Sequence, residues 1–117
     1  MSFRKDKLHA LLDHRSSQSE NLGEAFKENL EQGIHGIAFS AYEEGQEPGN
    51  QITEEQIRRR MQILKPNVKW IRSFSCTDGN EMIPVIAKEF GIKTLVGAWL
   101  SDDEELNQRE MTNLVEL

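Results

Sequence analysis

Residues 68–100 read VKWIRSFSCTDGNEMIPVIAKEFGIKTLVGAWL and contain one complete strand–helix–strand repeat. An apolar run from Val68 to Ser75 leads into a turn rich in Asp, Gly and Asn, then an amphipathic stretch, then a second apolar run from Lys93 to Leu100. Two parallel strands need a long connection between them, and that connection is usually a helix. The stretch therefore predicts parallel strands with a helical crossover.

The same pattern precedes this repeat. An apolar strand is predicted over residues 34–42, followed by a loop over residues 43–51 that is long for a strand-to-helix turn. The helix after this loop begins with a capping box formed by Thr53 and Gln56, and Pro66 ends it.

A third unit follows the repeat. Ser101 and Glu104 form a second predicted capping box, which starts a helix after the last strand. The apolar stripe of that helix consists of Leu106, Met111, Leu114 and Val115.

The predicted strands begin near residues 34, 68 and 93, which is the spacing of strand–helix units of roughly 30 residues. A closed barrel of eight such units takes about 250 residues. We therefore predict an α/β fold in which residues 34–117 form three βα units of a partial (β/α)8 TIM barrel with parallel strands. Residues 1–33 are predicted to be an N-terminal helical extension, with Leu8, Leu11 and Leu12 at helical spacing in its first helix and Asn21 capping its second.

Composition excludes several classes of partner. The formal net charge of -6 disfavours nucleic acid, because binding a polyanion needs a basic stripe that displaces counterions. Membrane insertion is not expected, because no apolar run approaches the roughly 20 residues that span a bilayer. The N-terminal residues lack the apolar core of a secretory signal, so a cytoplasmic location is expected.

Neither a metal nor a cofactor is expected. His9, His14 and His35 have no ligand-like spacing, and no phosphate-binding glycine motif occurs. The single Cys76 is interpreted as a small packing residue, because no base can be placed beside it from the sequence.

The carboxyl ends of the predicted strands are the expected site. Tyr42, Ser75 and Trp99 all fall where a strand passes into its loop, and in such folds these loops converge. Aromatic faces beside hydroxyl and amide groups suit a sugar, although each ring also suits plain packing. Arg72 in mid-strand must offset its desolvation, through either a structural ion pair or a substrate contact.

The segments GIAFSAYEEGQEPG, IRSFSCTDGNE and TLVGAWL, in this order from Gly36 onwards, resemble the opening of microbial glycosyl hydrolases related to the family-seventeen β-1,3-glucanases. The resemblance implies a TIM barrel that hydrolyses β-1,3-linked glucans with retention. Two glutamates, one an acid/base and one a nucleophile about 5 Å away, perform that reaction.

The resemblance places neither catalytic glutamate in this chain. The Asn80–Glu81 pair follows the second strand rather than the fourth, so the catalytic pair is expected beyond Leu117 and the chain alone is expected to be inactive. Arg72 corresponds to an arginine of the family, and Phe74 stands where plant members have a tyrosine. Tyr42, Ser75 and Trp99 would line the substrate-binding pocket.

The resemblance thus predicts an N-terminal fragment of a glycoside hydrolase whose partner is a β-glucan or oligosaccharide. Two alternatives stay open. One is a non-catalytic β-glucan-binding remnant. The other is a small α/β interaction domain that associates with itself through exposed sheet edges.

Overall fold

The computed structural model describes residues 22–117. Residues 22–32 form a helix, and Gly33–Leu117 form a separate compact unit that contains the sheet. The predicted first helix and the predicted cap at Asn21 lie outside the described residues. No helix among the described residues is long and apolar enough to cross a membrane.

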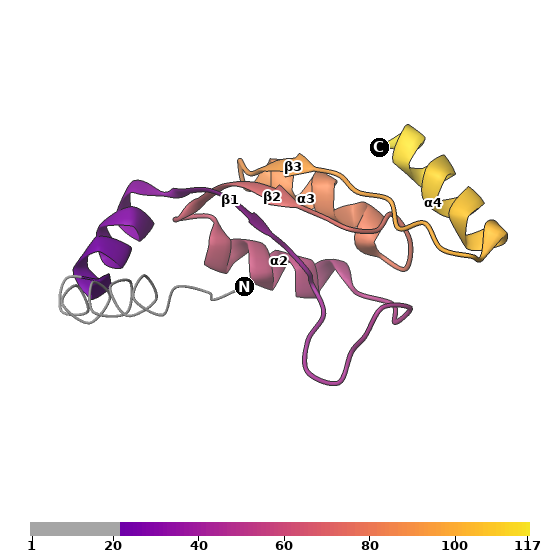
Figure 1. Ribbon diagram of the computed structural model, residues 1–117, viewed down its shortest axis with the longest axis horizontal. Coiled ribbons are helices and arrows are strands. Elements are labelled where there is room, and N and C mark those ends of the chain that lie inside the picture. The colour runs from indigo at the N-terminus through magenta and orange to yellow at the C-terminus, as the bar shows by residue number, and fades with distance from the viewer. Residues whose placement is uncertain (1–21) are drawn as a thin grey trace, which may run out of the picture. The chain divides into compact units, whose positions relative to one another are not determined.

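Three short strands form one parallel sheet (Figure 1). They are β1 (Ile34–Ala38), β2 (Val68–Arg72) and β3 (Lys93–Leu95), in the order β1-β2-β3. β2 pairs in parallel with both neighbours, and the crossovers between the strands contain helices. The predicted α/β fold with parallel strands is therefore confirmed.

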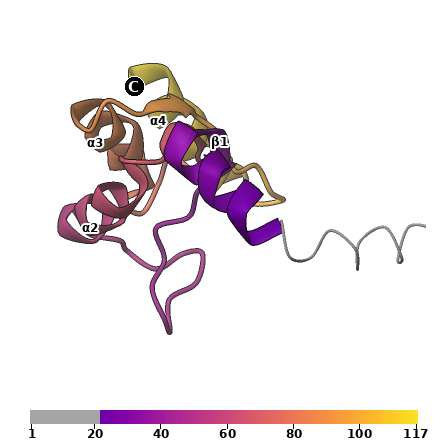
Figure 2. The same cartoon turned by 90° about the vertical axis from the view of Figure 1, so that its left-hand side faces the viewer.

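Helices α2 (Glu54–Leu64) and α3 (Ile83–Glu89) cover the same face of the sheet, and α3 follows a 3-10 turn, η1 (Asn80–Met82) (Figures 1 and 2). The last helix, α4 (Glu104–Glu116), lies near the carboxyl ends of the strands (Figure 1). With the helix over residues 22–32, the described part of the chain holds four α-helices and three strands.

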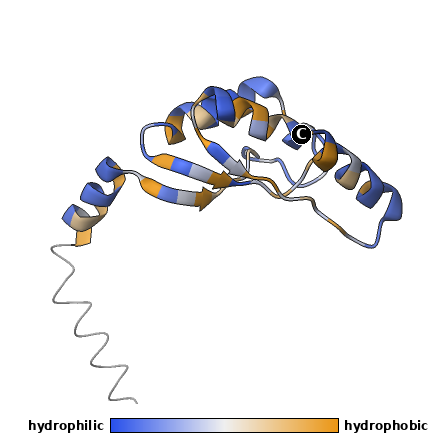
Figure 3. Ribbon diagram, turned by 90° about the horizontal axis from the view of Figure 1, so that it is seen from above, coloured by the Kyte–Doolittle hydropathy of each residue, from blue (hydrophilic) through white to orange (hydrophobic). Residues whose placement is uncertain are grey.

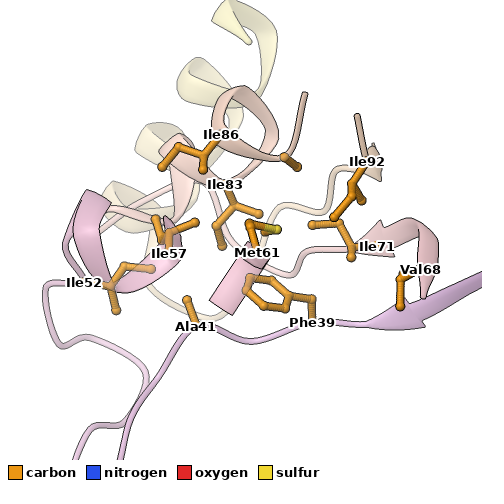
Figure 4. Close-up of a cluster of buried hydrophobic side chains, with 11 residues drawn as sticks. Phe39, Ala41, Ile52, Ile57, Met61, Val68, Ile71, Ile83, Ile86 and Ile92 are labelled. Carbon is orange, nitrogen blue, oxygen red and sulfur yellow. The ribbon is translucent and has the colours of Figure 1, made fainter. Parts of the chain in front are cut away.

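The hydrophobic core lies between the sheet and helices α2 and α3. Figure 4 shows Phe39, Met61 and Ile83 at its centre, with Ile71 of β2 to their right. Helical spacing places Ile57 and Met61 on one side of α2 and Ile83, Ile86 and Ala87 on one side of α3, and all five are buried. The buried cluster consists of Phe39, Ala41, Ile52, Ile57, Met61, Val68, Ile71, Ile83, Ile86, Ala87 and Ile92.

Within residues 33–117, no helix packs on the other face of the sheet. Ala38, Arg72 and Leu95 are register partners across the three strands, and all three are exposed. Along β1 and β2, hydrophobic and hydrophilic bands follow one another in Figure 3, as expected for a sheet with only one packed face. Val68 departs from this alternation, because it joins the buried cluster although it shares parity with Arg72.

All three strands end earlier than predicted. The ladder continues by one bond past β1 and β2, from the Phe39 N–H to the Arg72 carbonyl and from the Ser73 N–H to the Leu95 carbonyl. Beyond this point the segments separate to surround a cavity, so their apolar residues pack without pairing. The apolar runs over 34–42, 68–75 and 93–100 located the strands but overstated their lengths, and no residue of 93–100 is buried.

The two predicted capping boxes fare differently. The Thr53 side chain accepts from the Gln56 N–H, which confirms the first N-cap, but the Gln56 side chain turns away to the chain before the helix. The second box is wrong, because Asp103 and not Ser101 caps α4. Asp103 accepts from the Leu106 N–H at 3.0 Å.

The predicted apolar stripe of α4 does not form the face that packs against the rest of the protein. Met111 and Leu114 are exposed, and Val115 retains 85% of its accessible surface. The buried residue of this helix is Glu110, which is 1% exposed. α4 therefore attaches to the rest of the unit mainly through polar groups.

We expect Gly79→Ala to destabilise the fold far more than Gly45→Ala. Both glycines have positive φ, but a Cβ at Gly79 would lie 2.3 Å from the Ile52 carbonyl oxygen, whereas a Cβ at Gly45 would meet nothing within 4 Å. The expected losses in unfolding free energy are about 3 kcal/mol and about 1 kcal/mol respectively. Urea denaturation measures both. Equal losses would contradict the close contact between the Gly79 turn and Ile52.

Candidate functional site

A cavity of about 620 Å³ lies at the carboxyl ends of the three strands. Segments that follow each strand line it, together with the loop before α2 and one face of α4. The lining residues are Phe39, Ser40, Tyr42, Pro48, Gly49, Phe74, Ser75, Thr77, Asp78, Asn80, Trp99, Ser101, Leu106 and Glu110. Residues far apart in the sequence thus meet at the edge where parallel sheets usually place their sites.

Four of the five predicted site residues line this cavity, namely Tyr42, Phe74, Ser75 and Trp99. Trp99 is 59% exposed, so much of its ring is open to solvent. The other two rings are partly buried. The Tyr42 hydroxyl accepts a hydrogen bond from the Asn80 side-chain amide at 3.4 Å, which connects the segments after β1 and β2.

Arg72, the fifth predicted site residue, does not line this cavity. It lies on the uncovered face of the sheet, beside a second hollow that His35 and Trp70 also line. Its guanidinium carbon is 5.0 Å from the centre of the Phe74 ring. Within residues 22–117 it has no ion pair, and because it is exposed it does not need the buried partner that the sequence suggested.

The long loop after β1 is held against the cavity by buried amides. The Gln56 side-chain nitrogen donates to the Ala41 carbonyl at 2.6 Å and to the Gln46 side-chain oxygen. That oxygen also accepts from the Glu43 N–H at 2.9 Å. Gln56, the second residue of the predicted capping box, therefore organises this loop instead of closing the box.

Glu110 is the site residue that the sequence analysis missed. Its buried carboxylate accepts from the Ser75 hydroxyl at 2.5 Å and from the Thr77 hydroxyl at 2.8 Å. It also accepts from the Cys76 N–H at 2.7 Å and from the Trp99 N–H at 3.2 Å. All four partners are donors, so one carboxylate of α4 joins the segments that follow β2 and β3.

A sequence signal for this attachment did exist. Leu106, Glu110 and Asn113 follow the i, i+4, i+7 spacing of one helical face, and these are the least exposed positions along that face. The Asn113 amide donates to the Cys76 carbonyl at 2.6 Å. The sequence analysis looked for an apolar face, and it therefore missed a helix face whose least exposed members include an acid, Glu110, and an amide, Asn113.

The charge of the cavity lining is acidic. Asp78 and Glu110 are its two carboxylates, and none of the lining residues is a lysine, arginine or histidine. Arg109 lies 3.8 Å from Asp78, outside the lining. Among the described residues no group of three or more His, Cys, Asp or Glu side chains could hold a metal ion.

The lining combines a carboxylate whose oxygens are occupied with aromatic and polar surfaces. Glu110 already accepts four hydrogen bonds, so its oxygens are occupied by the protein. Hydrolysis with retention needs two carboxyl groups that reach the same glycosidic bond. The rings of Tyr42, Phe74 and Trp99 offer flat apolar surfaces, and Asn80 and Ser75 supply polar groups between them.

The chain was compared with family models, with curated proteins and with solved structures, and none of the three comparisons finds a match. The site must therefore be interpreted from its own geometry.

We expect Cys76 to be unreactive in the folded protein. Burial raises the pKa of its thiol to about 11 from the ordinary 9.0, and the charges of Glu110 and Glu81 add to the effect. About a hundredfold less thiolate is therefore present at pH 8 than in the unfolded chain. Reaction with a disulfide reagent should be at least that much slower without urea than with it.

The same thiol makes stability depend on pH. Between pH 9 and about 11 the unfolded thiol loses its proton while the folded thiol keeps it, so unfolding free energy falls as pH rises through this range. Cys76→Ala should show a weaker fall than the natural chain. An identical pH profile for both proteins would contradict the raised pKa.

Proposed function

We propose that the cavity at the strand ends binds a β-glucan or a short oligosaccharide of it. The observation that carries this proposal is that Tyr42, Phe74 and Trp99 line one cavity together with hydroxyl and amide groups. Sugar rings stack their C–H faces on aromatic rings and place their hydroxyls against polar groups at the ring edges. A volume of about 620 Å³ suits a ligand of a few sugar units.

We further propose that the three βα units are part of a TIM barrel of the glycoside hydrolase type. Parallel strands, helices on one face and a pocket at the carboxyl ends of the strands are compatible with this proposal. The motif resemblance to β-1,3-glucanases supplies the substrate. In this proposal the chain contributes to a retaining two-glutamate hydrolase, and no residue of the chain is assigned a catalytic role.

Binding is tested by the fluorescence of Trp99 in a Trp70→Phe background, titrated with laminari-oligosaccharides. We expect a saturable change in emission, because a sugar stacked on the exposed ring replaces water around it. Trp99→Ala should weaken binding at least tenfold in calorimetry, since stacking on a ring contributes about 1 kcal/mol or more. Leu100→Ala is the matched control, because Leu100 is similarly exposed and lies outside the cavity lining.

Two outcomes would count against this function. No emission change at millimolar oligosaccharide would argue against a sugar site, and equal binding by the Trp99 and Leu100 variants would argue against the stacking surface. In a reducing-end assay with β-1,3-glucan we expect no product above a heat-inactivated control. Release of new ends would show catalysis by this chain and would overturn the assignment of binding alone.

A second candidate function is self-association through the sheet. β1 and β3 are the edge strands of the described sheet, and Leu95 on β3 is 61% exposed. Unpaired strand edges with apolar side chains favour pairing with another copy. Sedimentation should then show a discrete dimer that Leu95→Lys dissociates, whereas a monomer at all concentrations would remove this candidate.

A further inference from the structure

We propose that the cavity selects neutral carbohydrate over anionic carbohydrate, and that Glu110 determines this selectivity. The inference rests on the proposed carbohydrate binding and specifies the chemical class of ligand. It follows from the charge of the lining and from the protons of the hydroxyl groups that Glu110 engages.

The protons of the two hydroxyl groups beside Glu110 are already donated to its carboxylate. Each hydroxyl has a single proton, and the hydroxyls of Ser75 and Thr77 both donate theirs to Glu110. The Ser75 oxygen also accepts from the Thr77 N–H at 3.2 Å, and it lies 3.2 Å from the Thr77 hydroxyl oxygen. Because the Thr77 proton goes to Glu110 at the shorter distance of 2.8 Å, the Ser75 oxygen keeps one lone pair for a ligand. Ser75 is half-buried and Thr77 is buried, so Ser75 is the group that meets a ligand, and it meets it as an acceptor.

A ligand must therefore bring the donor to this hydroxyl. Sugar hydroxyls can donate, whereas a carboxylate or phosphate group only accepts. An anionic group placed against Ser75 would face an oxygen with no proton to offer. The backbone N–H groups of Cys76 and Trp99 are not available either, because they too donate to Glu110.

Charge acts in the same direction. Glu110 is 1% exposed, so water screens its negative charge poorly, and Asp78 adds a second carboxylate to the lining. Arg72 lies on the uncovered sheet face, and Arg109 pairs with Asp78 at 3.8 Å from outside the lining. An anionic sugar would therefore have to approach the buried charge of Glu110 without a cation of the lining.

The test compares two probes of equal size. The first is a β-1,3-linked glucose tetramer, and the second is the same tetramer oxidised at C6 to carboxylates. Calorimetry of the whole chain at pH 7.5 and low ionic strength should give a dissociation constant at least tenfold lower for the neutral tetramer. Added salt should reduce the difference between the two dissociation constants, because it screens the repulsion between the ligand carboxylates and Glu110.

Glu110→Gln should reduce this preference at least threefold, because the amide removes the negative charge and releases hydroxyl protons toward the cavity. Glu105→Gln is the control, since it makes the same chemical change on an exposed position of α4. Should the Glu110 variant fail to fold, Ser75→Ala provides the second test. It should weaken binding of the neutral tetramer at least threefold and leave binding of the oxidised tetramer within twofold.

The outcomes separate the inference from the function on which it rests. Equal binding of the two tetramers, or tighter binding of the oxidised one, would overturn the selectivity and leave carbohydrate binding in place. Binding of neither would overturn both. A preference that survives Glu110→Gln unchanged would remove Glu110 as its cause, whereas a preference lost in that variant and kept in Glu105→Gln supports the inference.

Discussion

The functional end of this protein depends on one buried carboxylate. Glu110 of α4 accepts four hydrogen bonds from residues that follow β2 and β3. The apolar residues of the same helix, Met111, Leu114 and Val115, stay exposed. Hydrogen bonds to a charged acceptor are stronger than neutral ones, and a buried charge without them would be costly. The contact therefore holds together one wall of the cavity.

Packing on a single face of the sheet explains where the other features lie. Because α2 and α3 cover one face, Ile71 is buried and Arg72, the next residue, faces away from the core. Arg72 and the cavity residues are thus placed by different rules. The pleat of β2 puts Arg72 on the uncovered face of the sheet. Tyr42, Ser75 and Trp99 lie in the segments that follow the last ladder hydrogen bonds, and these segments surround the cavity. Phe74 lines the cavity and also lies beside the Arg72 guanidinium.

Local patterns predicted the parts of the structure that local physics governs. Ile57 and Met61 are buried because helical spacing places them on one side of α2, and Thr53 caps that helix because its oxygen reaches the Gln56 N–H. Strand ends were predicted less well. Apolar composition does not show whether a backbone pairs, so it could not distinguish β3 from the unpaired segment that leads to Trp99. Asp103 caps α4, whereas the backbone of Ser101 is bound on both sides by the side chain of Asn107 from the helix.

By itself the sequence determined the order of strands and helices, the core face of α2 and α3, and the residues at the carboxyl ends of the strands, because periodicity and turn chemistry act over a few neighbouring positions. Only the tertiary structure decided that Arg72 lies apart from the cavity and that Glu110 belongs to it. Ser75 and Glu110 are 35 positions apart, and their hydrogen bond is possible only when α4 packs against the turn after β2. An acidic residue in an amphipathic helix is ordinarily solvated, and burial among four donors is what gives this one its structural role.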